Sequence, residues 1–158
     1  MSIIHQALGG LRRAFAGLIL EAPARRAGID RLIKTLEKSG QAIEQSAART
    51  SARPSNFDTL AHIIGIERWG QRRMRVALGE PLALEEYDGY RPEEKNWLAL
   101  REQFRTTRQE TISLCKSLRM AGVDPSTRVP HNQFGEITLL GWLLYLTQHA
   151  KIESMKIN

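Results

Sequence analysis

The chain has 158 residues, a length typical of one domain with its own buried core. Apolar residues make up 42% and charged residues 25% of it, a balance that excludes an intrinsically disordered protein. Most of the formal charge of +6 lies in residues 1–53, which hold nine Lys/Arg and four Asp/Glu.

Four of the nine basic residues of this first third occur as doublets, Arg12–Arg13 and Arg25–Arg26, without interleaved aromatic residues. This pattern predicts an ordinary solvated face, and it leaves nucleic-acid binding as the weaker alternative. Cys115 is the single cysteine, so neither an intrachain disulfide nor a thiolate metal cluster can form, and we expect a cytoplasmic protein. The apolar runs are too short to span a bilayer.

The first part of the chain is predicted to form an N-terminal helical extension, residues 1–27. Its apolar residues fall at helical spacing over 3–20, and the helix is expected to end before Pro23. Packing on the rest of the protein is the simpler interpretation, and a membrane-surface helix is the alternative.

Two helices are predicted next. The first carries an apolar stripe from Ile29 to Ile43 and fades in the polar stretch 50–55. The second opens at Ser55 or Asn56, both good N-cap residues, and runs to about residue 78, where Gly79 and the proline after it stop it.

Residues 79–91 form a long predicted connection, and Pro92 is expected to be the first residue of the following helix. A second loop covers 122–134, and a final helix starts near Thr138. No alternating run is long enough to propose a sheet. The sequence therefore predicts an all-α, up-down four-helix bundle (28–158) with an additional N-terminal helix, all in a single domain, 1–158.

The last predicted helix contains two candidate metal ligands. Its apolar stripe ends with His149 and Glu153 on the same face, four residues apart. His62, on the apolar helix that opens near residue 55, is the best candidate for a third ligand. Two imidazoles and one carboxylate suit one divalent ion of Zn, Ni, Mn or Fe in a bundle core. The competing interpretation is that the histidines are core residues and that Glu153, close to the C-terminus, points to water.

Three segments resemble the DinB-like (damage-inducible, YfiT-like) family of metal-binding four-helix bundles. They are LAHIIGIERWGQRRM at 60–74, YDGYRP and the helix after it, and HNQFGEITLLGWLLYLTQHAKIESMKI at 131–157. The resemblance covers about the last 105 residues, and it implies a DinB-like bundle in which His62, His149 and residue 153 bind the metal.

The family's closing His-x-x-x-His pattern ends here in Glu153 in place of the second histidine. The resemblance implies metal-dependent thiol transfer or hydrolysis on a small thiol or electrophile, and a homodimer. His131 matches the family's closing pattern and is expected at the mouth of the site, with a turn or capping role as the alternative. The catalytic residues are not identified. The alternative is a non-catalytic dimerisation or stress-response module with a degenerate site, and the position of Glu153 distinguishes the two.

Overall fold

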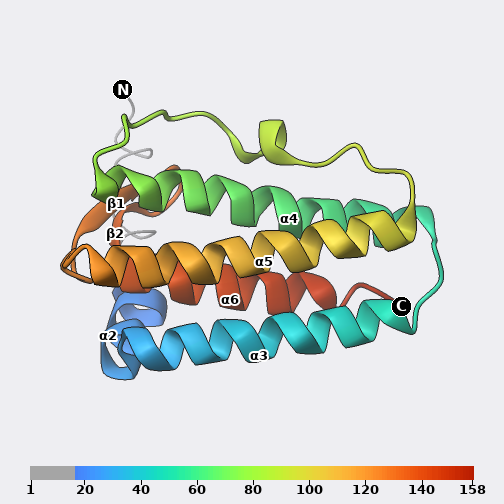
Figure 1. Cartoon of the computed structure of the whole chain (residues 1–158), viewed down its shortest axis with the longest axis horizontal. Coiled ribbons are helices and arrows are strands. Elements are labelled where there is room, and N and C mark those ends of the chain that lie inside the picture. Colours follow the sequence, from blue (N-terminus) through green and yellow to red (C-terminus); the bar gives the residue numbers. More distant parts are fainter. Residues whose placement is uncertain (1–16) are drawn as a thin grey trace, which may run out of the picture.

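The structure, a computed structural model, describes residues 17–158 (Figure 1). Most of the helix predicted over 3–20 therefore lies outside the described residues. The elements, in chain order, are η1 (a π-helical turn, Gly17–Glu21), α2 (Ala22–Ala27), α3 (Ile29–Ala48), α4 (Pro54–Met74), the 3-10 turns η2 (Arg75–Leu78) and η3 (Tyr87–Tyr90), α5 (Trp97–Met120), β1 (Arg128–His131), β2 (Gly135–Thr138) and α6 (Leu139–Ser154).

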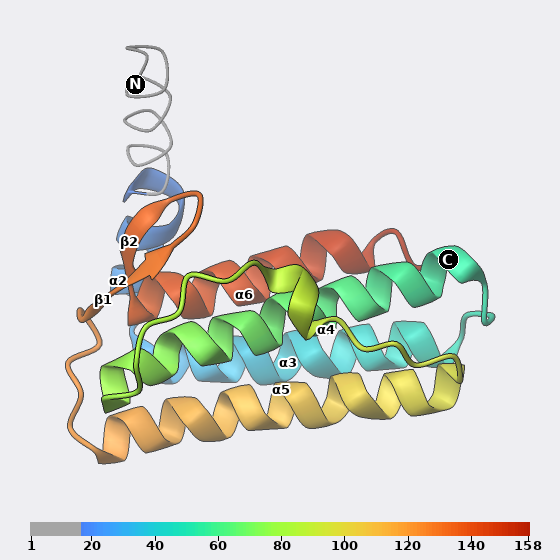
Figure 2. The ribbon, with the colours of Figure 1, turned by 90° about the horizontal axis from the view of Figure 1, so that it is seen from above.

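The predicted all-α bundle is confirmed: α3, α4, α5 and α6 pack side by side, with η1 and α2 against one end (Figures 1 and 2). Helices α4 and α5 run in the same direction (Figure 1), since Arg68 donates to Gln103 at 3.2 Å and Gln71 donates to Thr111 at 2.9 Å. Helices α3 and α6 run the opposite way, so the four helices do not alternate in direction as the predicted up-down order requires. The two helices that carry the candidate ligands, α4 and α6, therefore pack against each other in antiparallel directions.

The parallel arrangement of α4 and α5 requires the connection 79–96 to return along the length of α4 (Figure 1). The Trp69 indole and the Arg73 guanidinium both donate to the carbonyl of Glu85, each at 3.0 Å. At Gly65, an added Cβ would lie 2.7 Å from Arg91 Cγ and 3.3 Å from its Cα. This long loop is therefore packed directly on the helix that carries His62.

A buried ion pair joins three helices of the bundle. The Arg108 guanidinium on α5 makes two hydrogen bonds of 2.8 Å to the Glu67 carboxylate on α4. It also donates to the Leu36 carbonyl and the Ser39 hydroxyl on α3, at 3.0 and 2.9 Å. Both charged side chains are 5% exposed or less. Such a pair is tolerated in a core because each charge keeps several partners.

Three predicted helix boundaries are wrong. Pro23 does not follow a helix end but lies in the first turn of α2. Helix α4 begins at Pro54, and the buried Asn56 side chain donates instead to the carbonyls of Ser51 and Asn158. Helix α5 begins at Trp97, five residues after Pro92. Proline is favoured in a first helical turn, which explains two of the three shifts.

The late start of α5 has a local cause. The Asn96 side chain accepts a hydrogen bond from the Ala99 amide, which caps the helix there. Arg91 is extended, with φ −69° and ψ 132°, the conformation favoured before a proline.

The predicted loop over 122–134 contains the first strand of a short antiparallel hairpin. Strands β1 and β2 pair Val129 with Ile137 and His131 with Gly135. Val129 and Ile137 are buried. Four residues per strand are too few for an alternating pattern to stand out in the sequence. Helix α6 follows directly and starts near Thr138, as predicted. The Thr138 hydroxyl caps the helix, and the Glu21 carboxylate holds Thr138 in place.

Candidate metal centre

The structure brings His62, His149 and Glu153 together between α4 and α6. The Nε2 atoms of the two histidines lie 3.2 Å apart, although 87 positions separate the residues in sequence. One ligand atom from each of the three residues lies within 4.8 Å of the others. All three side chains are half-buried, so the group is open to solvent on one side. The predicted association of these three residues is therefore confirmed as a candidate group.

Two features of the helices place the group. His149 and Glu153 are four residues apart on α6 and project from one face. Gly70 on α4 lets α6 approach closely, because an added Cβ would lie 2.8 Å from Leu146 Cδ2. The antiparallel contact that follows brings the His62 turn of α4 to the last turns of α6.

The protonation states suit metal binding. Burial, together with the neighbouring His62, lowers the pKa of His149 to about 4. Burial also lowers the pKa of His62. Burial raises the pKa of Glu153, but its hydrogen bond with Lys156 and the positive charges around it outweigh this effect, and the pKa is lowered overall. At neutral pH the group presents neutral imidazoles and a carboxylate, the forms that bind cations.

The geometry also fits one ion. Metal–ligand distances of about 2.0–2.2 Å in a tetrahedral site place ligand atoms roughly 3.4 Å apart. The separation of 3.2 Å between the imidazoles is close to this value, and a carboxylate oxygen lies within 4.8 Å of them. Two nitrogens and one oxygen form a donor set that first-row divalent ions accept.

Tyrosine side chains flank the two histidines. The Tyr87 ring from η3 makes an edge-to-face contact with His62, with the centroids 5.3 Å apart. The Tyr145 ring from α6 lies 5.7 Å from that of His149. Burial raises the pKa of Tyr145 to about 12, so its hydroxyl stays protonated.

His131 lies outside this group, at the end of β1. Its ring is buried and packs against Tyr145 and Trp69, with centroids 4.7 and 5.0 Å apart. Its Nδ1 accepts hydrogen bonds from the amides of Gln133 and Phe134 in the hairpin turn. These contacts give His131 a structural part in the hairpin, and Tyr145 lies between it and His149.

Sequence reasoning missed the charged and aromatic neighbours of the group. Lys156, just beyond the end of α6, donates to Glu153 at 2.7 Å, a contact that its spacing of three residues could have indicated. Tyr87 and Arg91 belong to the long connection, and no periodic signal fixes where such a segment packs.

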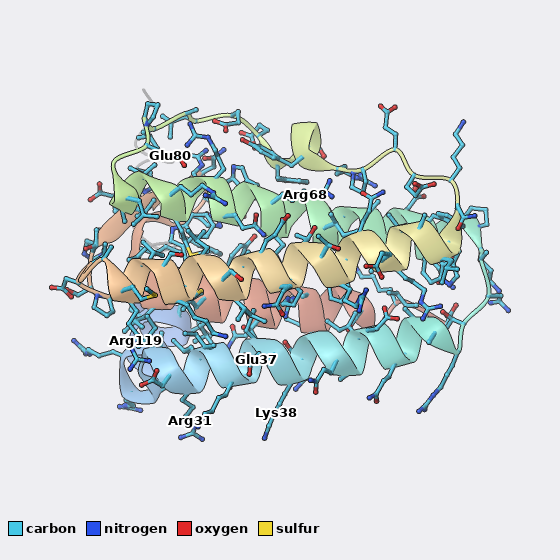
Figure 3. The ribbon with its side chains drawn as sticks, viewed as in Figure 1. Arg31, Glu37, Lys38, Arg68, Glu80 and Arg119 are labelled. Carbon is cyan, nitrogen blue, oxygen red and sulfur yellow. The ribbon has the colours of Figure 1, made fainter. Side chains whose placement is uncertain are left out.

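Helix α3 carries three exposed basic residues, Arg31, Lys34 and Lys38, at spacings of three and four residues. Arg31 and Lys38 are exposed and point away from the bundle, on either side of Glu37 along the helix (Figure 3).

Fold and site together define an all-α helical bundle with a candidate site of two histidines and one glutamate for a metal ion. Comparisons of the chain with protein-family models, with curated proteins and with solved structures find no match. Among residues 17–158, no helix combines the length and the apolar character that crossing a bilayer requires.

Proposed function

We propose that this chain is a DinB-like metalloprotein that binds one divalent ion through His62, His149 and Glu153 and uses it in thiol transfer or hydrolysis. The observation that carries the proposal is the convergence of three ligand atoms, from two helices, within 4.8 Å of one another. The family assignment rests on the three sequence segments described above.

The position of Glu153 favours a working site over a degenerate one. In a degenerate site the carboxylate would be free to turn away from the histidines. Instead its side chain is only 19% exposed and lies within reach of both imidazoles. A carboxylate in place of a third histidine also lowers the net charge of the centre by one.

A divalent ion in this position would act as a Lewis acid and would lower the pKa of a bound water or thiol. The chain contributes the remaining elements of the site. The half-buried His62 and His149 leave the centre open to a small molecule, and the Tyr87 and Tyr145 rings form apolar walls beside them. This arrangement suits a small thiol or electrophile.

Metal content tests the proposal directly. Protein purified without a metal-affinity tag, with Zn, Ni, Mn and Fe added back separately, is analysed for bound metal. We expect about one equivalent in the wild type and a sharp loss in His62→Ala and His149→Ala. Gln148→Ala, at the neighbouring position of α6, is the matched control and should retain its metal.

Absence of metal from the wild type after every addition would overturn the proposal and would favour the non-catalytic module. Equal metal content in wild type and both histidine variants would also overturn it, because the ion would then be held elsewhere. Circular dichroism of each variant shows whether the helical fold is retained.

A further inference from the structure

Lys156 contacts a ligand of the candidate centre from the solvent side. Its ammonium donates to Glu153 Oε2 at 2.7 Å, and the Lys156 side chain is 61% exposed. Lys156 follows the end of α6, so its side chain can move without disturbing the helix. In the described structure it holds the carboxylate that a metal ion would need.

A second cation, Arg91, lies along the His62 side of the centre. Its backbone packs on Gly65, and its guanidinium donates to the carbonyl of Asp58 at 3.3 Å. Asp58, His62 and Gly65 share one face of α4, at spacings of four and three residues. The Arg91 side chain therefore passes over the helical turn that carries His62.

The charges leave this side of the centre positive. With a divalent ion bound, the two neutral imidazoles and the ionised carboxylate would give the metal centre a net charge of +1. Lys156 and Arg91 add two positive charges, and Asp88 is the acidic neighbour that offsets one of them. This net positive charge attracts an anion, and hydrogen bonds from the charged Lys156 and Arg91 side chains would orient it.

We propose that Lys156 and Arg91 form an anion-recognition side of the metal centre, which selects a small carboxylate as the molecule that meets the ion. This inference rests on the proposed function. Lys156 exchanges partners: it pairs with Glu153 when the metal is absent, and it turns to the substrate carboxylate when Glu153 binds the ion. Arg91 contributes from the His62 turn of α4, held in place by the packing of residues 79–96 on that helix.

The test uses the full chain loaded with Co²⁺, whose visible absorption reports changes around the ion. Acetate is titrated at constant ionic strength, because salt screens exposed charges. Acetamide has nearly the same shape without the charge, and it serves as the neutral probe. The variants are Lys156→Met, Arg91→Met, the charge-retaining Lys156→Arg, and Lys151→Met as the control, an exposed lysine of α6 on the side that faces α3.

We expect acetate to change the spectrum of the wild type and acetamide to leave it unchanged. Loss of one charged hydrogen-bond donor should raise the acetate dissociation constant about tenfold or more in Lys156→Met and in Arg91→Met. Lys156→Arg should recover most of the affinity, and Lys151→Met should match the wild type. Removal of the competing ion pair should also raise the Co²⁺ affinity of Lys156→Met, by up to about fivefold.

Two results would overturn this inference while leaving the metal site intact. One is equal acetate affinity in the wild type, Lys156→Met and Arg91→Met; the other is binding of acetamide as tight as that of acetate. Failure of the wild type to bind Co²⁺ would instead overturn the proposed function, and this inference with it.

Discussion

His62 and His149 face each other across the α4–α6 contact, with their Nε2 atoms 3.2 Å apart. Without a metal, one of these nitrogens must carry a proton that it donates to the other. With a metal, both must be free of protons to bind it. The same short contact is therefore a hydrogen bond between the two histidines without a metal, and it becomes the distance between two metal ligands when the ion binds. Glu153 takes no part in this contact, so its contribution to metal binding can be tested separately.

Glu153→Gln is expected to weaken metal binding by more than the roughly 10- to 100-fold that loss of an outer-shell partner costs, because a directly coordinating charge is lost. Glu153→His supplies a nitrogen ligand at the same position and should restore binding. Competition with a coloured chelator measures both affinities. Equal affinities in wild type and Glu153→Gln would show that the two histidines bind the ion without residue 153.

Arg108→Met is expected to destabilise the fold by about 3–5 kcal/mol, because it leaves the Glu67 charge buried without its main partner. The double variant Glu67→Met/Arg108→Met removes both charges and should recover much of that loss. Urea unfolding of the wild type and the variants measures these differences. A loss in the double variant equal to that in Arg108→Met would contradict this explanation.

The stability of the protein should fall as the pH drops from about 7 to 4. Burial, together with the charge of Arg73, lowers the pKa of His131 from its usual value near 6.5 to about 4. Between pH 6.5 and 4 the His131 side chain is therefore protonated in the unfolded chain but neutral in the folded protein, and this difference favours unfolding. The loss for this residue is at most about 3 kcal/mol, complete near pH 4.

His131→Asn removes this titration and keeps a side-chain oxygen to accept the turn amides. Its free energy of unfolding, measured in urea at several pH values, should decline less steeply with falling pH than that of the wild type. His149 contributes its own decline in both proteins. Parallel curves for the two proteins would show that His131 is not the source of the effect.

Cys115 should not react with thiol reagents in the folded protein. Its side chain is 1% exposed, and burial raises the pKa of the thiol to about 12, so the reactive thiolate is scarce at neutral pH. Absorbance with a disulfide reagent, with and without denaturant, measures the reaction. Fast labelling without denaturant would show that this part of the bundle opens readily.

The sequence by itself determined the helical class, most of the helix positions and the three residues of the candidate centre. Apolar spacing of three and four residues identifies a helix and its inward face, and His149 and Glu153 share such a face on α6. Gly79 and Thr138 marked two helix boundaries correctly, because a left-handed turn and an N-cap depend on local chemistry.

Only the tertiary structure decided how these helices meet. The parallel arrangement of α4 and α5, the pairing of Glu67 with Arg108 and the position of Arg91 beside His62 all join residues far apart in the chain. A helical stripe states that a face is buried but not which partner covers it, and an irregular connection such as 79–96 has no period at all. Its course is fixed by contacts with α4, such as the one at Gly65, and these contacts exist only once the bundle has formed.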